Sequence, residues 1–152
     1  MLGAERIEIT TNSFVGTIEH LADPRIVSVE RSDEKDEEEG MLLRYTLMVQ
    51  DEAVKLPMGV GYSPEKGFVA ITLMLPHGFS PPISIDTEVE IDNWCRQEDP
   101  DFKFIAGLNP DFHFLYLLKK SVLAQSTYDL EGWISRVINF TPKLATKIAE
   151  SV

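Results

Sequence analysis

The fold is decided by residues Phe102–Lys119, Phe-Lys-Phe-Ile-Ala-Gly-Leu-Asn-Pro-Asp-Phe-His-Phe-Leu-Tyr-Leu-Leu-Lys. Two runs of aromatic and aliphatic residues flank the triplet Asn109-Pro110-Asp111. Pro presets the backbone angle φ in such a turn, and Asn and Asp can hydrogen-bond their own backbone. Together the two runs and the triplet predict a β-hairpin with a three-residue loop.

The register of this hairpin determines which side chains share a face. A symmetric loop predicts four cross-strand pairs: Leu108 with Phe112, Ala106 with Phe114, Phe104 with Tyr116, and Phe102 with Leu118. This register gathers the aromatic side chains on one face, whereas a slip of one residue would distribute them over both faces. We expect the aromatic face (Phe104, Phe112, Phe114 and Tyr116) to pack under a C-terminal helix through Trp133, Ile134 and Val137, because each apolar surface must be covered.

The composition limits both the size of the fold and the kind of partner. The chain has 152 residues and a net charge of -11, with a single cysteine, Cys95. This length predicts one domain, residues 1–152, with a core that needs no disulfide. The negative charge argues against nucleic acid and against anionic membrane surfaces as partners. A lone cysteine and the lack of a long apolar run predict a cytoplasmic protein in a reducing compartment.

The N-terminal part predicts one helix followed by a charged run. Phe14, Ile18 and Leu21 recur at helical spacing between residues 10 and 21, and Thr11 or Asn12 could cap this helix. Residues 33–39 hold six acidic residues and one lysine. Such a run is too charged to fold alone, so we expect a solvated hairpin loop.

Four segments before residue 77 have strand character. Residues 25–31 and 41–50 are rich in alternating apolar side chains. Residues 53–62 contain Pro57 and two glycines, which predicts an irregular strand or an edge strand. Residues 68–75 are the most hydrophobic run, so we expect them at the centre of the sheet.

Residues 83–98 fit two periodicities. Ile83, Ile85, Thr87, Val89 and Ile91 alternate with acidic and polar residues, which is the pattern of a strand. A strand would, however, place the carboxylates of Asp86, Glu88, Glu90 and Asp92 along one face, about 7 Å apart. A helix spreads them around its axis and puts the first of them at its positive end, so a helix is the better prediction.

The C-terminal part predicts two helical segments. Ser126 or Thr127 could cap the first, whose apolar face contains Leu130, Trp133, Ile134, Val137 and Ile138. Thr141-Pro142 interrupts this pattern. Because proline is well tolerated at the first helical position, we expect a second segment from Pro142 to about Glu150.

Few residues suggest a catalytic, metal or cofactor site. Cys95, His113 and Asp99 could form a nucleophilic site, but no motif places them together, and a buried structural cysteine is the better interpretation. His20, His77 and His113 lack metal-ligand spacing. Gly59-Val-Gly61 lacks the remaining residues of a dinucleotide or phosphate motif. The acidic residues from Asp86 to Asp92 lack the glycine-containing loop of calcium sites, so no metal, cofactor or catalytic residue is expected.

Three stretches resemble a known family: Leu73-Met-Leu-Pro76, the pair Asn93-Trp94, and Tyr128-Asp-Leu-Glu-Gly-Trp133 after the hairpin. The chain is similar to the bacterial family of proposed sensory-transduction regulators, which has the type III secretion chaperone-like fold. The resemblance implies an α+β domain, an antiparallel sheet packed against helices in the rough order α-β-β-β-α-β-β-α. It also implies a small acidic protein, often dimeric, that binds other polypeptides and has no known reaction.

Two functions remain open from the sequence. The first is a non-enzymatic protein-binding module, chaperone-like or regulatory, that acts on other polypeptides. The second is a small-ligand-binding protein or an enzyme of unrecognised type, which would require a deep pocket with convergent polar groups. For the first, the predicted register places Ile105, Leu115, Leu117 and His113 on the second face of the hairpin. We expect this surface to bind a protein partner or a second copy in a homodimer, unless the N-terminal helix covers it.

Overall fold

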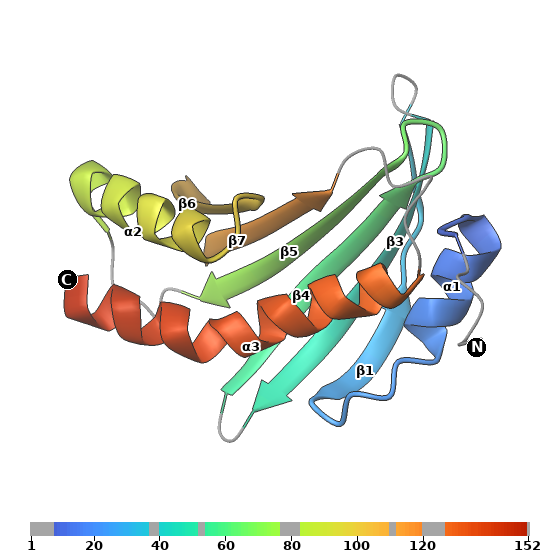
Figure 1. Cartoon of the computed structure of the whole chain (residues 1–152), viewed down its shortest axis with the longest axis horizontal. Coiled ribbons are helices and arrows are strands. Elements are labelled where there is room, and N and C mark those ends of the chain that lie inside the picture. The colour runs from blue at the N-terminus through green and yellow to red at the C-terminus, as the bar shows by residue number, and fades with distance from the viewer. Residues whose placement is uncertain are drawn as a thin grey trace, which may run out of the picture.

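The protein is an α+β domain with one antiparallel sheet and three helices (Figure 1). The computed structural model describes residues 8–36, 40–51, 54–76, 83–109, 112–119 and 127–151. The helices are α1 (Thr11–Glu19), α2 (Ile85–Glu98) and α3 (Thr127–Ser151). The strands are β1 (Ile26–Arg31), β2 (Glu34–Asp36), β3 (Gly40–Asp51), β4 (Val54–Ser63), β5 (Phe68–Pro76), β6 (Phe102–Asn109) and β7 (Phe112–Lys119).

The sheet has the strand order β1-β3-β4-β5-β7-β6, and the short β2 also pairs with β3. Five strands therefore precede α2, rather than the three of the expected order. The most hydrophobic strand, β5, lies between β4 and β7, so its central position is confirmed. The described helices all lie on one face of the sheet, with α3 crossing it and α2 running beside β6 (Figure 1).

The core lies between these helices and the sheet. Alternate residues of β3 (Leu43, Tyr45, Leu47 and Val49) point into it, as period-two alternation predicts. From α1, the ring of Phe14 packs against the rings of Tyr45 and Tyr62 with centroids 6.0 and 5.3 Å apart. From α3, the ring of Phe140 lies between Trp94 of α2 and Phe102 of β6, with centroids 5.1 and 5.0 Å away.

The hairpin is confirmed, but its register differs from the symmetric one by one residue. Phe104 lies opposite Leu115 instead of Tyr116, and Ile105 lies opposite Phe114. An irregularity in β6 between Ile105 and Asn109 shifts the pairing; Pro110 and Asp111 lie outside the described residues. Such a bulge adds residues to one strand only, so it breaks the symmetry on which the prediction depended.

This register separates the aromatic side chains. Phe102 and Phe104 point toward the helices and are buried, together with Ile134 and Val137 of α3. Phe114 and Tyr116 point to the other face, so the prediction that they pack under α3 is wrong. The side chain of Phe112 lies outside the described part of the chain.

Within residues 83–98 the chain forms the helix Ile85–Glu98, as the repulsion between strand carboxylates predicted. Ser84 caps α2 by accepting a hydrogen bond from the Thr87 amide. Two acidic residues, Asp86 and Glu88, lie in the first turn, where the helix dipole favours negative charge.

Two strand predictions need correction. β4 is neither irregular nor at an edge: it runs for ten residues between β3 and β5. Pro57 is tolerated because its missing N–H would face β5 just beyond the last paired residue, Met58. The acidic run is partly a strand, since β2 pairs with the start of β3, while residues 37–39 lie outside the described residues.

The terminal helices differ slightly from prediction. α1 is capped by Thr10, whose hydroxyl accepts a hydrogen bond from the Ser13 amide at 3.2 Å, one residue before the expected cap. α3 is one continuous helix with Pro142 inside it, not two segments. It begins at Thr127, whereas Ser126 lies outside the described residues. Near the proline, the Thr141 hydroxyl donates a hydrogen bond to the Val137 carbonyl at 3.0 Å.

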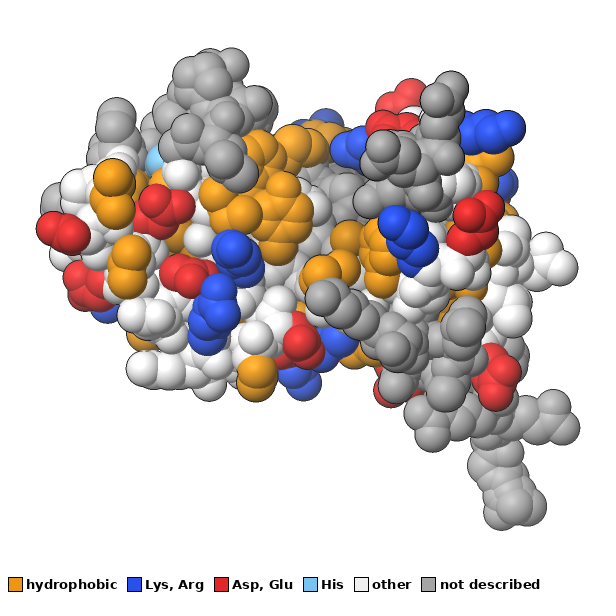
Figure 2. Space-filling model, turned by 90° about the horizontal axis from the view of Figure 1, so that it is seen from above, with side chains coloured by type: hydrophobic (Ala, Val, Ile, Leu, Met, Phe, Trp, Pro, Cys, Tyr) orange, Lys and Arg blue, Asp and Glu red, His pale blue; other side chains and the backbone are white. Residues whose placement is uncertain are grey.

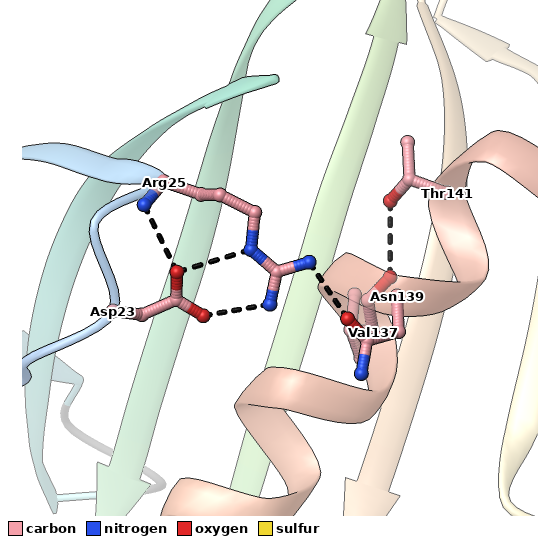
Figure 3. A network of polar contacts seen from close by, with 5 residues as sticks. All are labelled: Asp23, Arg25, Val137, Asn139 and Thr141. Atoms are coloured by element: carbon pink, nitrogen blue, oxygen red, sulfur yellow. Dashed lines mark hydrogen bonds and ion pairs between the residues drawn. The ribbon is translucent and has the colours of Figure 1, made fainter.

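One polar network joins the start of β1 to α3 (Figure 3). The guanidinium of Arg25 donates two hydrogen bonds to the Asp23 carboxylate, at 3.0 and 2.7 Å, and a third to Asn139 of α3 at 2.7 Å. The hydrogen bond from Arg25 holds the pKa of Asp23 below its usual range. The network thereby fixes the connection from α1 to β1 against the C-terminal helix.

Candidate functional site

The predicted interaction residues do not form one surface. Leu115, Leu117 and His113 are buried in the core under the helices, at 0%, 0% and 1% exposure. Ile105 is half-buried on the opposite face, because it pairs with Phe114. The shifted register therefore removes the surface that the symmetric register predicted, and the face to consider is the one that carries Ile105.

The sheet has an open face, which we define as the side of β3, β4, β5, β7 and β6 that points away from the helices. No described helix lies on it. Cross-strand pairing assigns to it Leu42, Arg44, Thr46, Met48, Gln50, Lys55, Pro57, Gly59, Gly61, Ser63, Phe68, Ala70, Thr72, Met74, Phe114, Tyr116, Leu118, Lys103 and Ile105.

The centre of the open face is apolar and partly aromatic. The rings of Phe114 and Tyr116 lie side by side with centroids 6.0 Å apart, and they pair with Met74 and Thr72 of β5. Gly59 lies next to Thr72 and has no side chain, so the surface is lower at this point. A Cβ added to Gly59 would have its nearest neighbour at 3.9 Å. Figure 2, a view from above and not onto the open face, shows hydrophobic side chains grouped near the middle of the molecule with Lys and Arg side chains beside them.

The charges of the open face differ in sign from those of the whole chain. The chain has 25 acidic residues and 14 Lys and Arg. The described residues of the open face include Arg44, Lys55 and Lys103 but no carboxylate. Acidic side chains lie at its β1 and β2 border, where Glu30 of β1 is paired in register with Thr46 and Glu34 of β2 forms an ion pair with Arg44 at 2.7 Å. Outward sheet faces are usually polar, so this apolar and weakly basic face is unusual for an acidic protein.

Two cavities between described residues are open to the surface and not enclosed. One of about 530 Å³ lies beside α3 and is lined by Arg136, Asn139 and Lys143 among others. Another of about 520 Å³ lies between the connection from α1 to β1 and α3, and its lining includes Asp23. The lowered pKa of Asp23 has a structural cause, its hydrogen bonds with Arg25, and indicates no catalytic acid.

Asp99 is a buried carboxylate with a structural role. It is 1% exposed and accepts hydrogen bonds from Arg136 of α3 at 2.6 Å and from the Asp101 amide at 2.9 Å. The ammonium group of Lys119 lies 4.0 Å from it. These groups compensate the buried charge and fix the turn from α2 to β6.

Cys95 is a buried structural residue. Burial, with a smaller effect from the Asp92 and Glu98 carboxylates, raises the pKa of its thiol to about 12, which makes it a poor nucleophile. Cys95 lies on α2. The Asp99 carboxylate accepts a hydrogen bond from Arg136 and not from His113, so the nucleophilic arrangement of Cys95, His113 and Asp99 considered from the sequence is not formed. In the described part of the chain, no group of three His, Cys, Asp or Glu residues is placed to hold a metal ion. None of the helices described is both long and apolar enough to cross a membrane.

The open face was missed because the register was assigned from the aromatic residues. A signal was present in the sequence: Lys103, Ile105, Phe114, Tyr116 and Leu118 fall on one face if the pairing slips by one residue, and this alternative register was available from alternation alone. Comparison with known proteins adds no family or fold assignment. No protein-family model, no curated protein and no solved structure matches this chain.

Proposed function

We propose that the chain is a non-enzymatic protein-binding module, chaperone-like or regulatory, that acts on other polypeptides in the cytoplasm as a homodimer. One observation carries this proposal: from β3 across to β6 the open face has an apolar, aromatic centre and no carboxylate among its described residues, with acidic side chains only at the β1 and β2 border, although the chain has a net charge of -11. Interface centres are typically depleted of charged residues and enriched in Tyr, Phe, Met and Arg.

The charges of the open face indicate the chemistry of its partner. Lys103 is paired in register with Tyr116, and Arg44 and Lys55 lie on the same face on β3 and β4, across β5 from Phe114 and Tyr116. The complementary partner is a polypeptide segment with an apolar stretch flanked by carboxylates. Adjacent strands lie about 4.8 Å apart, so the five strands of the face span roughly 20 Å, enough for one helix or two strands of a partner.

A binding experiment with two synthetic peptides tests the proposal. Both have the same apolar stretch; one is flanked by glutamates and the other by lysines, and fluorescence anisotropy measures their dissociation constants. Because the whole chain is acidic, non-specific attraction favours the lysine peptide. We expect tighter binding of the glutamate peptide, which only a local basic and apolar surface explains. Preference for the lysine peptide would contradict the proposal.

A matched pair of variants locates the binding. Thr72→Glu places a carboxylate at the centre of the open face, next to Tyr116 and Gly59. Ile85→Glu places the same group on α2, at a side chain that is 78% exposed. We expect Thr72→Glu to raise the dissociation constant of the glutamate peptide at least tenfold and Ile85→Glu to leave that constant unchanged. Circular dichroism should show that both variants are folded. If both variants bound the glutamate peptide with equal affinity, the open face would be excluded as its binding site.

A further inference from the structure

The two edge strands of the sheet differ in whether their outward backbone N–H groups have hydrogen-bond partners. At one edge, β6 directs the amides of Phe102, Phe104 and Ala106 away from β7. These amides donate hydrogen bonds to the Asp99 carbonyl at 3.0 Å, the Asp92 carboxylate at 2.8 Å and the Glu88 carboxylate at 2.7 Å. The β6 edge is therefore closed to another strand by groups of α2 and of the turn that follows it.

The edge formed by β1 is open. In the sheet β1 is bordered by β3 alone, and five of its six residues are exposed. Val27 and Val29 are 48% and 40% exposed, although large apolar side chains on a covered edge are normally buried. Among the described strands, only β3 pairs with β1.

The pairing of β1 with β3 shows which backbone groups are available. The Ser32 amide donates to the Arg44 carbonyl at 2.8 Å, and the register is regular from Ser28 to Arg31. Hydrogen-bonded and non-hydrogen-bonded pairs alternate in an antiparallel ladder. The N–H and C=O groups of Val29 and Arg31 consequently point away from β3, toward the open edge.

We propose that a second copy of this chain occupies the β1 edge, so that two β1 strands pair antiparallel about a two-fold axis. Only residues with outward backbone groups can exchange hydrogen bonds, which restricts the registers. If Val29 lies opposite Arg31 of the other copy, the two Glu30 side chains oppose each other. This places like charges directly across, which is unfavourable. If Val29 lies opposite Val27, the pairing is centred on Ser28 and has to continue through the irregularity between Ile26 and Ser28, which interrupts the ladder.

The third register has no such conflict. With Val29 opposite Val29 of the other copy, Ser28 lies opposite Glu30 and Arg31 lies opposite Val27. The contact is self-complementary, as a two-fold interface requires. The axis is then perpendicular to the sheet, so the open faces of both copies lie on the same side of one continuous sheet. This contact specifies the homodimer of the proposed function and rests on that part of it, whereas peptide binding by the open face does not depend on it.

Sedimentation over a range of micromolar concentrations tests the contact. We expect the wild type to dimerise and Val29→Lys to be a folded monomer, because the two lysines would meet at the axis. Ile85→Lys, which introduces the same charge on α2, should dimerise like the wild type. A wild type that stays monomeric, or a Val29→Lys variant that dimerises unchanged, overturns the proposal. The peptide-binding assay measures a different surface, so its outcome does not decide whether the β1 edges pair.

Two further variants test the register and remain informative if Val29→Lys does not fold. Ser28→Lys would oppose Glu30 of the other copy, so we expect a several-fold lower dissociation constant; weaker dimerisation would exclude the register. Val29→Cys should form a disulfide between copies under mild oxidation, whereas the control Ile85→Cys should not. Since Cys95 is buried, the introduced thiol is the reactive one among the described residues. Absence of the Val29→Cys disulfide overturns the contact.

Discussion

The carboxylate of Asp92 accepts a hydrogen bond from the backbone amide of Phe104 at 2.8 Å, and thereby joins a helix side chain to the edge of the sheet. Its other oxygen accepts from Arg96 at 3.1 Å, so the side chain is held in place from its own helix. The negative residues that made this stretch difficult to assign are thus partly explained: the carboxylates of Glu88 and Asp92, four residues apart, serve as acceptors for β6.

Removing this acceptor should destabilise the fold. We expect Asp92→Ala to lower the free energy of unfolding by about 1–3 kcal/mol, because the amide of Phe104 loses its partner in a partly buried place. Asp92→Asn keeps an acceptor oxygen and should cost less. Urea denaturation of the three proteins measures the difference. Equal stability of Asp92→Ala and the wild type would show that water replaces the carboxylate at no cost.

Two phenylalanines of the hairpin test its register. Phe104 is 2% exposed, so Phe104→Ala should cost about 3–5 kcal/mol. Phe114 is half-buried on the open face, so Phe114→Ala should cost clearly less. Thermal or urea unfolding of both variants gives the comparison. Similar large losses in both variants would favour the symmetric register, which places both rings under α3, and would remove the basis of the open face.

The ion pair between Asp23 and Arg25 should make stability depend on pH. The pKa of Asp23 is lowered in the folded protein, chiefly by the hydrogen bond from Arg25, so its contribution is present at neutral pH. That contribution is lost as the pH falls below the unfolded value of about 3.8 and through the lower folded pKa. We expect Asp23→Asn to be about 1 kcal/mol less stable than the wild type at pH 7. The difference should shrink below pH 4 in urea titrations; a difference that is constant with pH would mean that the charge contributes nothing.

Two glycines should respond in opposite directions to alanine. Gly59 has no positive φ, and an added Cβ would meet its neighbours at ordinary distance, so Gly59→Ala should stabilise by about 0.4–1 kcal/mol. Gly40 has a φ of 77°, and its added Cβ would meet the carboxylate of Glu65, so Gly40→Ala should destabilise. Differential scanning calorimetry of both variants distinguishes these effects. Stabilisation by Gly40→Ala would contradict the positive φ of Gly40 at the start of β3.

The sequence predicted the elements well where one local force dominated. Repulsion between carboxylates was sufficient to assign α2, and alternation was sufficient to place Tyr45 and Leu47 in the core. Prediction from the sequence failed where the strand register depended on an irregularity elsewhere in the strand. The irregularity between Ile105 and Asn109 changes the face of Phe114, and nothing in the local pattern fixes its position except Gly107. For the same reason the candidate surface was assigned to Leu115 and Leu117, which lie in the core.

Proline was also interpreted too strictly. Pro57 suggested an edge strand, and Pro142 suggested a break in the C-terminal helix. Both conclusions assumed that the missing N–H would leave a neighbour unsatisfied. In the fold, the missing donor of Pro57 would face a place where pairing with β5 has already ended, and α3 continues through Pro142. Such tolerance depends on the partners around each proline, which sequence spacing does not specify.

The closure of the β6 edge limits how far molecules of this chain can join. A sheet with two free edges can add copies without end and grow into a fibre, whereas a sheet with one free edge has used it once a single neighbour is bound. Glu88 and Asp92 thus act as a stop to growth, and pairing through β1 would end at two molecules. A Glu88→Ala, Asp92→Ala double variant would free the amides of Phe104 and Ala106, while the Phe102 amide would keep its bond to the Asp99 carbonyl; the freed part of β6 would give further copies a second place to add.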